Sequence, residues 1–242
     1  MAKLASSSYT GNGIDNRSLT GVGFQPTWLI VKRSGSSAAI HKTTRFSGLV
    51  SSSYSGRVQD SDQIQAFEAD GFQVGTDLAV NADGDTIFYQ AFLDGGDSDY
   101  AEVLYTGNGT DDRSITGAGF APLFALVIAN DTVNSGTYFR TASMTAGESQ
   151  SLLDAEPEAN GIQDLEADGI QVGTIADVNT DADLYSFLAF KDTNSADEGQ
   201  YSGDDNDDRS ITGVGFQPTW ICVKRDNVAN FGQRMRMGVN AG

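Results

Sequence analysis

The stretch that decides the fold is Arg17-Ser-Leu-Thr-Gly-Val-Gly-Phe-Gln-Pro-Thr-Trp28, and the 242-residue chain contains it three times. It returns as Arg113-Ser-Ile-Thr-Gly-Ala-Gly-Phe-Ala-Pro-Leu-Phe124 and as Arg209-Ser-Ile-Thr-Gly-Val-Gly-Phe-Gln-Pro-Thr-Trp220, each time 96 residues further on. Units that stack into solenoids or propellers are roughly 20–50 residues long, so this period indicates whole domains in tandem.

The period divides the chain into three parts. Residues 1–104 and 105–200 hold two full copies, which we call repeat 1 and repeat 2, and residues 201–242 hold the front of a third, repeat 3. A domain of about 100 residues can bury a core, whereas a fragment as short as repeat 3 usually needs staples or a partner. We therefore expect repeat 3 to be completed by another chain or by further residues.

Each copy of the repeated stretch leads into an apolar segment. The Thr-Gly-x-Gly-Phe-x-Pro part is turn chemistry, because glycine supplies positive φ and proline fixes φ. The following run, Trp28–Arg33 and its counterparts at 124–129 and 220–225, suits a core strand. The phenylalanine of the turn is expected to be a core residue in each copy, at Phe24, Phe120 and Phe216.

A second block occurs in the first two copies only. Ile64–Thr76 matches Ile162–Thr174, and each contains Asp-Gly between apolar flanks, which favours a β-hairpin with a type I′ turn. The closing segments Thr86–Phe92 and Leu184–Phe190 keep one apolar face with a period of two. The chain is therefore predicted to be all-β, with tandem β-sandwich domains of jelly-roll or lectin-like type.

The composition is strongly acidic. The chain has 33 Asp and Glu residues but only 15 Lys and Arg residues, which gives a net charge of −18. Such a surface repels itself at low salt, and the repulsion is screened in molar salt, where the Debye length is about 3 Å. This is typical of a protein from a halophile. Nucleic acid and anionic membranes are poor partners for this charge because both need clustered Lys and Arg. No nucleic-acid binding or membrane insertion is expected, since no apolar run approaches the ~18 residues of a membrane helix.

The sequence predicts no enzyme. His41 is the only histidine, so no Ser/His/Asp set can recur with the domain. No Asp/Glu pair is singled out for glycoside cleavage. The single cysteine, Cys222, takes the place of Ile30 and Leu126 and is expected to be a small buried hydrophobe.

Two acidic patterns are candidate calcium ligands. Asp177, Asn179, Asp181 and Asp183 resemble the opening of a calcium loop, but the sixth-position glycine, the distal glutamate and the flanking helices are missing. A turn is the favoured interpretation, and a structural calcium ion is the only cofactor that stays open. The acidic loops before each repeated arginine are expected to be solvated tips in which Asp pairs locally with Arg.

Two kinds of contact surface remain. Tyr54 and Tyr100 lie in polar surroundings and are candidate glycan contacts, whereas Trp28 and Trp220 head core strands and are expected to be buried. Repeat 3 lacks the Asp-Gly hairpin and the closing strand, and proteins avoid such open edges. Its assembly edge is predicted at Trp220, Val223, Met235 and Met237.

The order of motifs resembles a known family. Tyr-Thr-Gly-Asn-Gly, Arg-Ser-Ile-Thr-Gly-x-Gly-Phe-x-Pro, Asp-Gly-Phe-x-Val-Gly and a closing Tyr segment are similar to a domain repeated in tail-fibre and other virion-surface proteins of tailed phages. The resemblance covers both full copies and the front of the third. It implies a β-sandwich without known catalysis. The family commonly has an acidic residue after the proline, where this chain has Thr27, Leu123 and Thr219.

Together, the resemblance and the composition predict a structural protein on the virion surface of a tailed virus, with a halophilic archaeal host. It would form a tail fibre, spike, or capsid decoration or turret used in assembly and host attachment. The expected partners are copies of itself in a trimer or pentamer, other virion proteins, and a host surface glycan or S-layer glycoprotein. The alternative is a secreted carbohydrate-binding module without catalysis.

Overall fold

The computed structural model describes residues 3–35, 38–44, 46, 48–53, 59–95, 99–129, 136–152, 156–193 and 196–225, and the backbone of 234–237. The described chain is built from antiparallel strands and two helices of one turn each, α1 (Leu78–Asn81) and α2 (Ala176–Asn179). The predicted all-β class is confirmed. Tyr54 lies outside the described residues, as do the side chains of Met235 and Met237.

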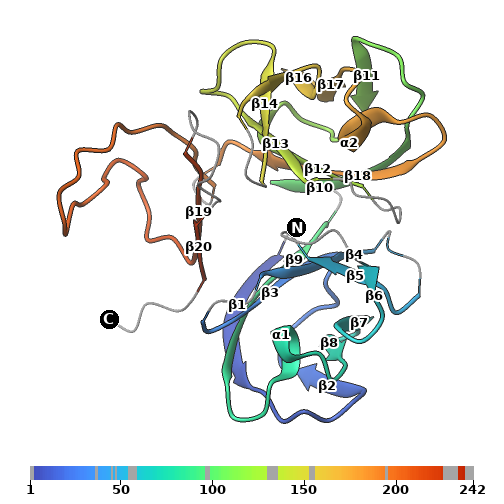
Figure 1. Ribbon diagram of the computed structural model, residues 1–242, viewed down its shortest axis with the longest axis vertical. Coiled ribbons are helices and arrows are strands. Elements are labelled where there is room, and N and C mark those ends of the chain that lie inside the picture. Colours follow the sequence, from blue (N-terminus) through green and yellow to red (C-terminus); the bar gives the residue numbers. More distant parts are fainter. Residues whose placement is uncertain are drawn as a thin grey trace.

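Repeat 1 is a sandwich of a six-stranded and a three-stranded sheet (Figure 1). The large sheet has the order β1 (Lys3–Thr10), β9 (Thr86–Leu93), β3 (Trp28–Arg33), β4 (Ile40–Thr43), β5 (Ser51–Ser53), β6 (Gln59–Asp60). The small sheet has the order β2 (Arg17–Thr20), β8 (Gly71–Val74), β7 (Ile64–Glu68). The closing strand β9 therefore lies between β1 and β3, and α1 leads into it.

Repeat 2 has the same architecture, strand for strand. Its large sheet has the order β10 (Tyr100–Thr106), β18 (Leu184–Lys191), β12 (Pro122–Ala129), β13 (Tyr138–Thr141), β14 (Glu148–Ser151), β15 (Glu158–Ala159). Its small sheet has the order β11 (Arg113–Thr116), β17 (Gly169–Val172), β16 (Ile162–Glu166). Because β10 pairs with β18 from Tyr100 onward, Tyr100–Leu104 belong to the large sheet of repeat 2 and are counted with it from here on, although Tyr100 also contacts Trp28 of repeat 1.

Each sandwich buries a core between its two sheets. In repeat 1 it joins Leu29 and Val31 of β3 to Phe72 and Val74 of β8. The closing strands present the predicted face to this core, since Ile87, Tyr89 and Ala91, and in repeat 2 Tyr185, Phe187 and Ala189, are all buried. Phe24 and Phe120 of the turns are buried as well, which confirms their predicted core role.

The Asp-Gly hairpin forms, but its predicted turn type is wrong. Glu68 pairs with Gly71, so the two loop residues are Ala69 and Asp70, and neither has positive φ. Gly71 is instead the first residue of β8, where a Cβ would come within 1.9 Å of the Leu19 carbonyl oxygen. The glycine is required by the close approach of β2 and not by the turn.

Repeat 3 contributes one two-stranded sheet, β19 (Trp220–Val223) paired with β20 (Arg234–Met237). In the register, Trp220 faces Met237 and Cys222 faces Met235. This hairpin is the counterpart of β3–β4 and β12–β13. Figure 1 shows it beside the two sandwiches, apart from both small sheets.

Candidate functional site

The repeated Tyr, Arg and one buried Asn form a polar clasp. In repeat 1, Arg17 donates from Nη1 to the Thr10 carbonyl (2.7 Å) and to Asn81 Oδ1 (3.2 Å). Its guanidinium stacks over the Tyr9 ring at 5.5 Å, and the Tyr9 hydroxyl donates to the Val80 carbonyl (2.6 Å). Burial raises the pKa of Tyr9, so the hydroxyl keeps the proton that it donates.

Asn81 completes the clasp with every polar group of its side chain. Its Nδ2 donates to the carbonyls of Ile14 and Gly75, both at 2.8 Å, and its Oδ1 also accepts from the Asn12 backbone N–H at 3.1 Å. The side chain is fully buried. The clasp thus ties the loop between β1 and β2 to α1 and to the end of β8.

Repeat 2 builds the same clasp from Arg113, Tyr105 and Asn179. Arg113 Nη1 reaches Asn179 Oδ1 at 3.2 Å and stacks on Tyr105 at 5.7 Å. Asn179 Nδ2 donates to the carbonyls of Thr110 and Gly173, at 2.8 and 2.9 Å. Asn179 was a candidate calcium ligand, but its amide is committed to these bonds.

The other three candidate calcium ligands surround the same helix and turn. Asp177 lies in α2, Asp181 is exposed in the following turn, and Asp183 precedes β18. Within the described part of the chain, no group of three His, Cys, Asp or Glu side chains is placed to share a metal ion. The backbone of this turn is used by the fold, because the Gly107 N–H donates to the Asp183 carbonyl at 2.8 Å.

Repeat 3 keeps the arginine of the clasp, but among its described residues no asparagine side chain bonds to it. Arg209 still stacks on Tyr201 at 5.6 Å and still donates to a backbone carbonyl, that of Ser202. In place of an amide it meets Asp204 at 3.5 Å, in an exposed ion pair. The predicted local Asp–Arg pairing is therefore found in repeat 3. In repeats 1 and 2 it is wrong, because the buried asparagine takes the arginine.

A second recurrent carboxylate holds the glycine turn. Asp70 accepts from the backbone N–H groups of Gly21 (3.1 Å) and Gly23 (2.5 Å), and Asp168 does the same for Gly117 (3.3 Å) and Gly119 (2.6 Å). The Asp of the Asp-Gly pair is thus a cap for the Thr-Gly-x-Gly turn of the facing strand. The recurrence of both residues at matching positions is the signal that could have identified this role.

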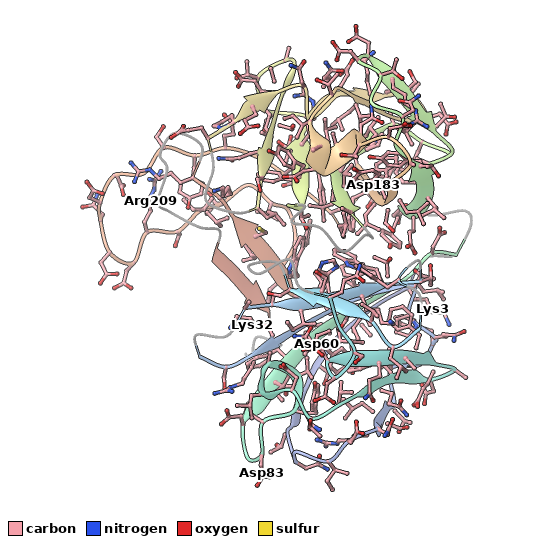
Figure 2. All side chains as sticks on the ribbon, turned by 45° about the vertical axis from the view of Figure 1, so that its right-hand side comes forward. Lys3, Lys32, Asp60, Asp83, Asp183 and Arg209 are labelled. Atoms are coloured by element: carbon pink, nitrogen blue, oxygen red, sulfur yellow. The ribbon has the colours of Figure 1, made fainter. Side chains whose placement is uncertain are left out.

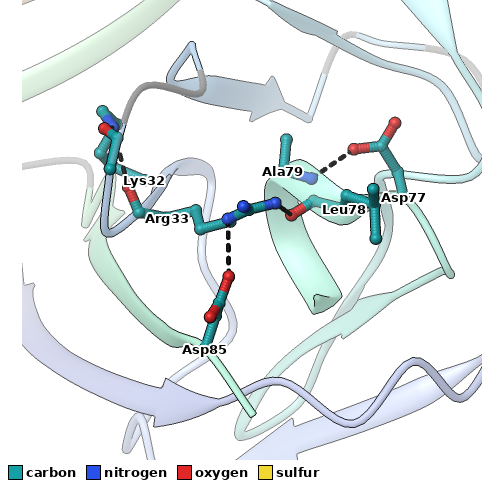
Figure 3. A network of polar contacts seen from close by, with 7 residues as sticks. Lys32, Arg33, Asp77, Leu78, Ala79 and Asp85 are labelled. Carbon is teal, nitrogen blue, oxygen red and sulfur yellow. Dashed lines mark hydrogen bonds and ion pairs between the residues drawn. The ribbon is translucent and has the colours of Figure 1, made fainter. Parts of the chain in front are cut away.

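Repeat 1 has one further polar network beside α1, drawn in Figure 3. Arg33 pairs through Nε with Asp85 at 2.9 Å and donates from Nη1 to the Leu78 carbonyl at 3.1 Å. Asp77 caps the helix by accepting from the Ala79 N–H at 2.7 Å. This network joins β3, α1 and the start of β9, and repeat 2 has Ala129 in place of Arg33.

The three repeats meet in one apolar cluster, which we call the shared cluster. It lies on the outer faces of the large sheets, away from both sandwich cores. Its main members are Trp28, Ile30 and Phe92 of repeat 1, Tyr100, Leu126, Ile128, Leu188 and Phe190 of repeat 2, and, packed against them, Phe124, Trp220 and Cys222. Strands β3, β12 and β19 hold equivalent positions in the three repeats, and each turns the same face into this cluster.

Aromatic contacts cross between the repeats. Phe190 lies 5.7 Å from Trp28 and stacks on Phe124 at 4.2 Å, and Phe124 stacks in turn on Trp220 at 6.4 Å. Trp28 is fully buried, as predicted, and Trp220 is half-buried. Polar contacts flank the apolar ones, including Thr44 Oγ1 to Glu102 Oε2 at 2.8 Å and Gln150 Nε2 to the Arg225 carbonyl at 3.1 Å.

The shared cluster contradicts the prediction that Tyr100 is a glycan contact. Only 3% of it is exposed, and its ring lies 6.1 Å from Trp28 and 5.2 Å from Phe190. No ring face is left open for a sugar. The sequence around Tyr100 is polar, but β10 pairs it with Phe190 of β18, and that pairing carries it into the apolar cluster.

In Figure 2, Asp83 lies at the end of repeat 1 that is farthest from repeat 2. Among the described residues, no helix has the length and apolar character needed to cross a membrane. Comparison of the chain with models of protein families, with curated proteins and with solved structures gave no match.

Proposed function

We propose that this chain is a structural protein of a virion surface appendage of a tailed virus. The observation that supports it most is the shared cluster. A string of independent binding modules needs only linkers, whereas here equivalent strands of three repeats bury aromatic side chains against one another. Such burial favours a stiff building block over a flexible array.

The polar residues that recur in the repeats support the same proposal. Tyr9, Arg17, Asn81 and Asp70, with their counterparts in repeat 2, all bind backbone groups or one another within their own domain. The recurring polar residues therefore hold the loops of their own domain in place. The resemblance to the repeated domain of virion-surface proteins and the acidic, self-repelling surface agree with an extracellular particle of a halophilic host.

In this role the chain forms a fibre, spike or capsid decoration as a symmetric homo-oligomer, a trimer or pentamer, attached to other virion proteins. Symmetry multiplies each weak contact to a host surface glycan or glycoprotein into avidity. The described part of the chain does not favour a separate carbohydrate-binding module, because the described glycan candidate, Tyr100, is buried.

The test is to locate the chain. Particles purified from a halophile culture by density gradient are digested and quantified by mass spectrometry, with labelled peptides from repeats 1 and 2 as standards. We expect the chain in the particle band at a fixed ratio to the major capsid protein, in multiples of three or five. Recovery only from the particle-free supernatant, together with glycan-array binding by the isolated chain, would favour the secreted module instead.

A further inference from the structure

The Thr-Gly-x-Gly-Phe turn binds two charged groups in repeats 1 and 2. In repeat 2 its backbone N–H groups hold a carboxylate, because Asp168 accepts from Gly117 at 3.3 Å and from Gly119 at 2.6 Å. Its phenylalanine carries a cation, because Lys191 Nζ lies 5.9 Å from the centre of the Phe120 ring. The corresponding residues of repeat 1 are Asp70, Gly21, Gly23, Lys3 and Phe24. Each of these two turns therefore has one negative and one positive partner.

The turn of repeat 3 has the same backbone conformation as the turn of repeat 2. The angle φ is 109° at Gly213 and 78° at Gly215, against 111° at Gly117 and 79° at Gly119. Backbone N–H groups in such a turn are oriented to bind an anion before the anion arrives. Among the described residues, however, no carboxylate accepts from Gly213 or Gly215 and no cation lies over the ring of Phe216.

A pocket with a volume of about 250 Å³ opens beside this turn. It is lined by the turn itself, residues 213–216, and by Asp192, Thr193, Ala196 and Asp197 from the segment that follows β18. Phe216 is half-buried there, whereas Phe24 and Phe120 are buried. The volume is below the roughly 300 Å³ at which ordinary ligand pockets begin, so an occupant has only a few heavy atoms.

The lining of the pocket contains groups for both signs of charge. The two glycine N–H groups suit a carboxylate, as in the other repeats. The ring of Phe216 and the carboxylates of Asp192 and Asp197 suit an ammonium group. These carboxylates repel a simple anion, and a simple cation leaves the N–H groups without a partner. A molecule with both charges uses the whole lining, and because it is neutral overall the net charge of −18 does not repel it.

We propose that this pocket binds a small zwitterion, a molecule of a few heavy atoms with one carboxylate and one ammonium group, as in a free amino acid. Its carboxylate accepts from the N–H groups of Gly213 and Gly215. Its ammonium group lies over Phe216 and is held by Asp192 and Asp197. The proposal rests on the pocket and on the contacts of the equivalent turns, and it stands apart from the virion role.

The test is a titration of the full chain, labelled with ¹⁵N, with glycine, β-alanine and γ-aminobutyrate. These probes carry the same two groups at increasing separation, and NMR spectra follow the backbone amides of the glycine turns. We expect saturable shifts at Gly213 and Gly215 with at least one probe. The amides of Gly117 and Gly119 should stay unchanged, because Asp168 already occupies them. If Gly213 and Gly215 do not respond at the highest soluble concentration of any probe, the proposal is wrong.

Two half-ligands, acetate and methylammonium, show whether both charges are used. Each should bind at least about tenfold more weakly than the best zwitterion, since each makes only one of the two sets of contacts. Acetate that shifts Gly213 and Gly215 as strongly as the zwitterion would mean that the ammonium group contributes nothing. That result would overturn the proposal in favour of a simple anion site.

Matched variants make the result specific to the pocket. Phe216→Ala and the double variant Asp192→Asn/Asp197→Asn should each weaken binding of the zwitterion by about tenfold. Asp181→Asn, which removes the charge of an exposed residue outside the pocket lining, should leave binding unchanged. A peptide with the sequence of residues 162–174 supplies the carboxylate of an Asp-Gly hairpin instead. If this peptide shifts the two glycine amides and no small zwitterion does, the occupant is a polypeptide segment and the proposal is overturned.

Discussion

Arg17 and Asn81 are 64 residues apart in the chain, and their side chains meet at 3.2 Å between Nη1 and Oδ1. The same contact recurs between Arg113 and Asn179 at the same distance. The arginine belongs to the repeated stretch at the front of the domain, and the asparagine belongs to the helix just before the closing strand. The contact therefore locks the two ends of the domain's sequence together.

The clasp makes Asn81 a sensitive position. Asn81→Ala removes the partner of two carbonyls, one backbone N–H and Arg17 at a fully buried site. Because unsatisfied buried groups keep their desolvation cost, we expect repeat 1 to lose about 2–4 kcal/mol of unfolding free energy. Urea unfolding followed by circular dichroism measures this loss.

Arginine variants supply the control for the clasp. Arg17→Ala should destabilise repeat 1, whereas Arg209→Ala should leave the unfolding of repeats 1 and 2 unchanged, because Arg209 meets only exposed partners. If the two arginine variants lose the same free energy of unfolding, the contact between Arg17 and Asn81 contributes nothing to stability.

The acid sensitivity of repeat 1 should depend on His41. Burial lowers the pKa of this histidine from 6.5 to about 3. The folded state stays neutral while the unfolded chain takes up a proton below pH 6.5, so the stability contribution is complete above pH 6.5 and falls as the pH drops from 6.5 toward 3. The slope from one group is at most about 1.4 kcal/mol per pH unit.

Repeat 2 provides the matching substitution. Phe139 faces Leu126 where His41 faces Ile30. His41→Phe should flatten the fall in unfolding free energy between pH 6.5 and 5, and Phe139→His should steepen it. His41 is the only histidine of the chain, so an unchanged pH profile in His41→Phe would show that the buried ring does not titrate as inferred.

Much of the fold could be predicted from the sequence because each pattern of apolar and turn residues occurs in two repeats. The apolar alternation of Ile87, Tyr89 and Ala91 identifies a face because Tyr185, Phe187 and Ala189 repeat it. The turn at Asp70 does not follow from the local dipeptide. There the bonds to Gly21 and Gly23, which lie 49 and 47 residues away, and the approach of Leu19 to Gly71 override the local preference.

The shared cluster could not be predicted from the sequence, for a related reason. Strand β3 is buried on both faces, so its sequence cannot tell the sandwich core, at Leu29 and Val31, from the contact between repeats, at Trp28 and Ile30. Likewise, polar neighbours in the sequence made Tyr100 resemble a surface residue. Its environment is set by β18, some 90 residues later, and no local pattern reports that pairing.

The shared cluster should couple the unfolding of the repeats. Both tryptophans of the chain belong to it, so tryptophan emission reports the cluster while circular dichroism reports all the strands. Phe190→Ala removes a ring that stacks on Phe124 within repeat 2 and meets Trp28 of repeat 1 edge-on, and it should cost about 3–5 kcal/mol. We expect the two signals to change together in the parent chain and to separate in Phe190→Ala, with emission changing first.

Phe187→Ala is the control on the same strand. Phe187 is as buried as any residue of repeat 2 but points into the sandwich core. Its loss should lower the stability of repeat 2 while the emission of Trp28 follows the unfolding of repeat 1. If both variants separate the signals alike, the cluster is no more than a passive contact between independent domains.

Salt should stabilise the chain more than it stabilises an ordinary domain. A net charge of −18 repels itself within a Debye length of about 10 Å at 0.1 M salt, and that length falls to about 3 Å at 1 M. The ion pairs seen in the described residues, Arg33–Asp85 and Arg209–Asp204, offset little of this repulsion. We expect the unfolding midpoint to rise steeply with KCl up to about 1 M.

The control replaces Asp205, Asp207 and Asp208, all exposed in repeat 3, by Asn. With three fewer charges the variant should be more stable than the parent in dilute buffer and equal to it in molar salt, because only the screened term differs. Differential scanning fluorimetry across a KCl series measures both midpoints. A parent chain that is already fully stable in dilute buffer, with no gain from the three substitutions, would contradict the self-repulsion argument and with it the halophilic interpretation of the composition.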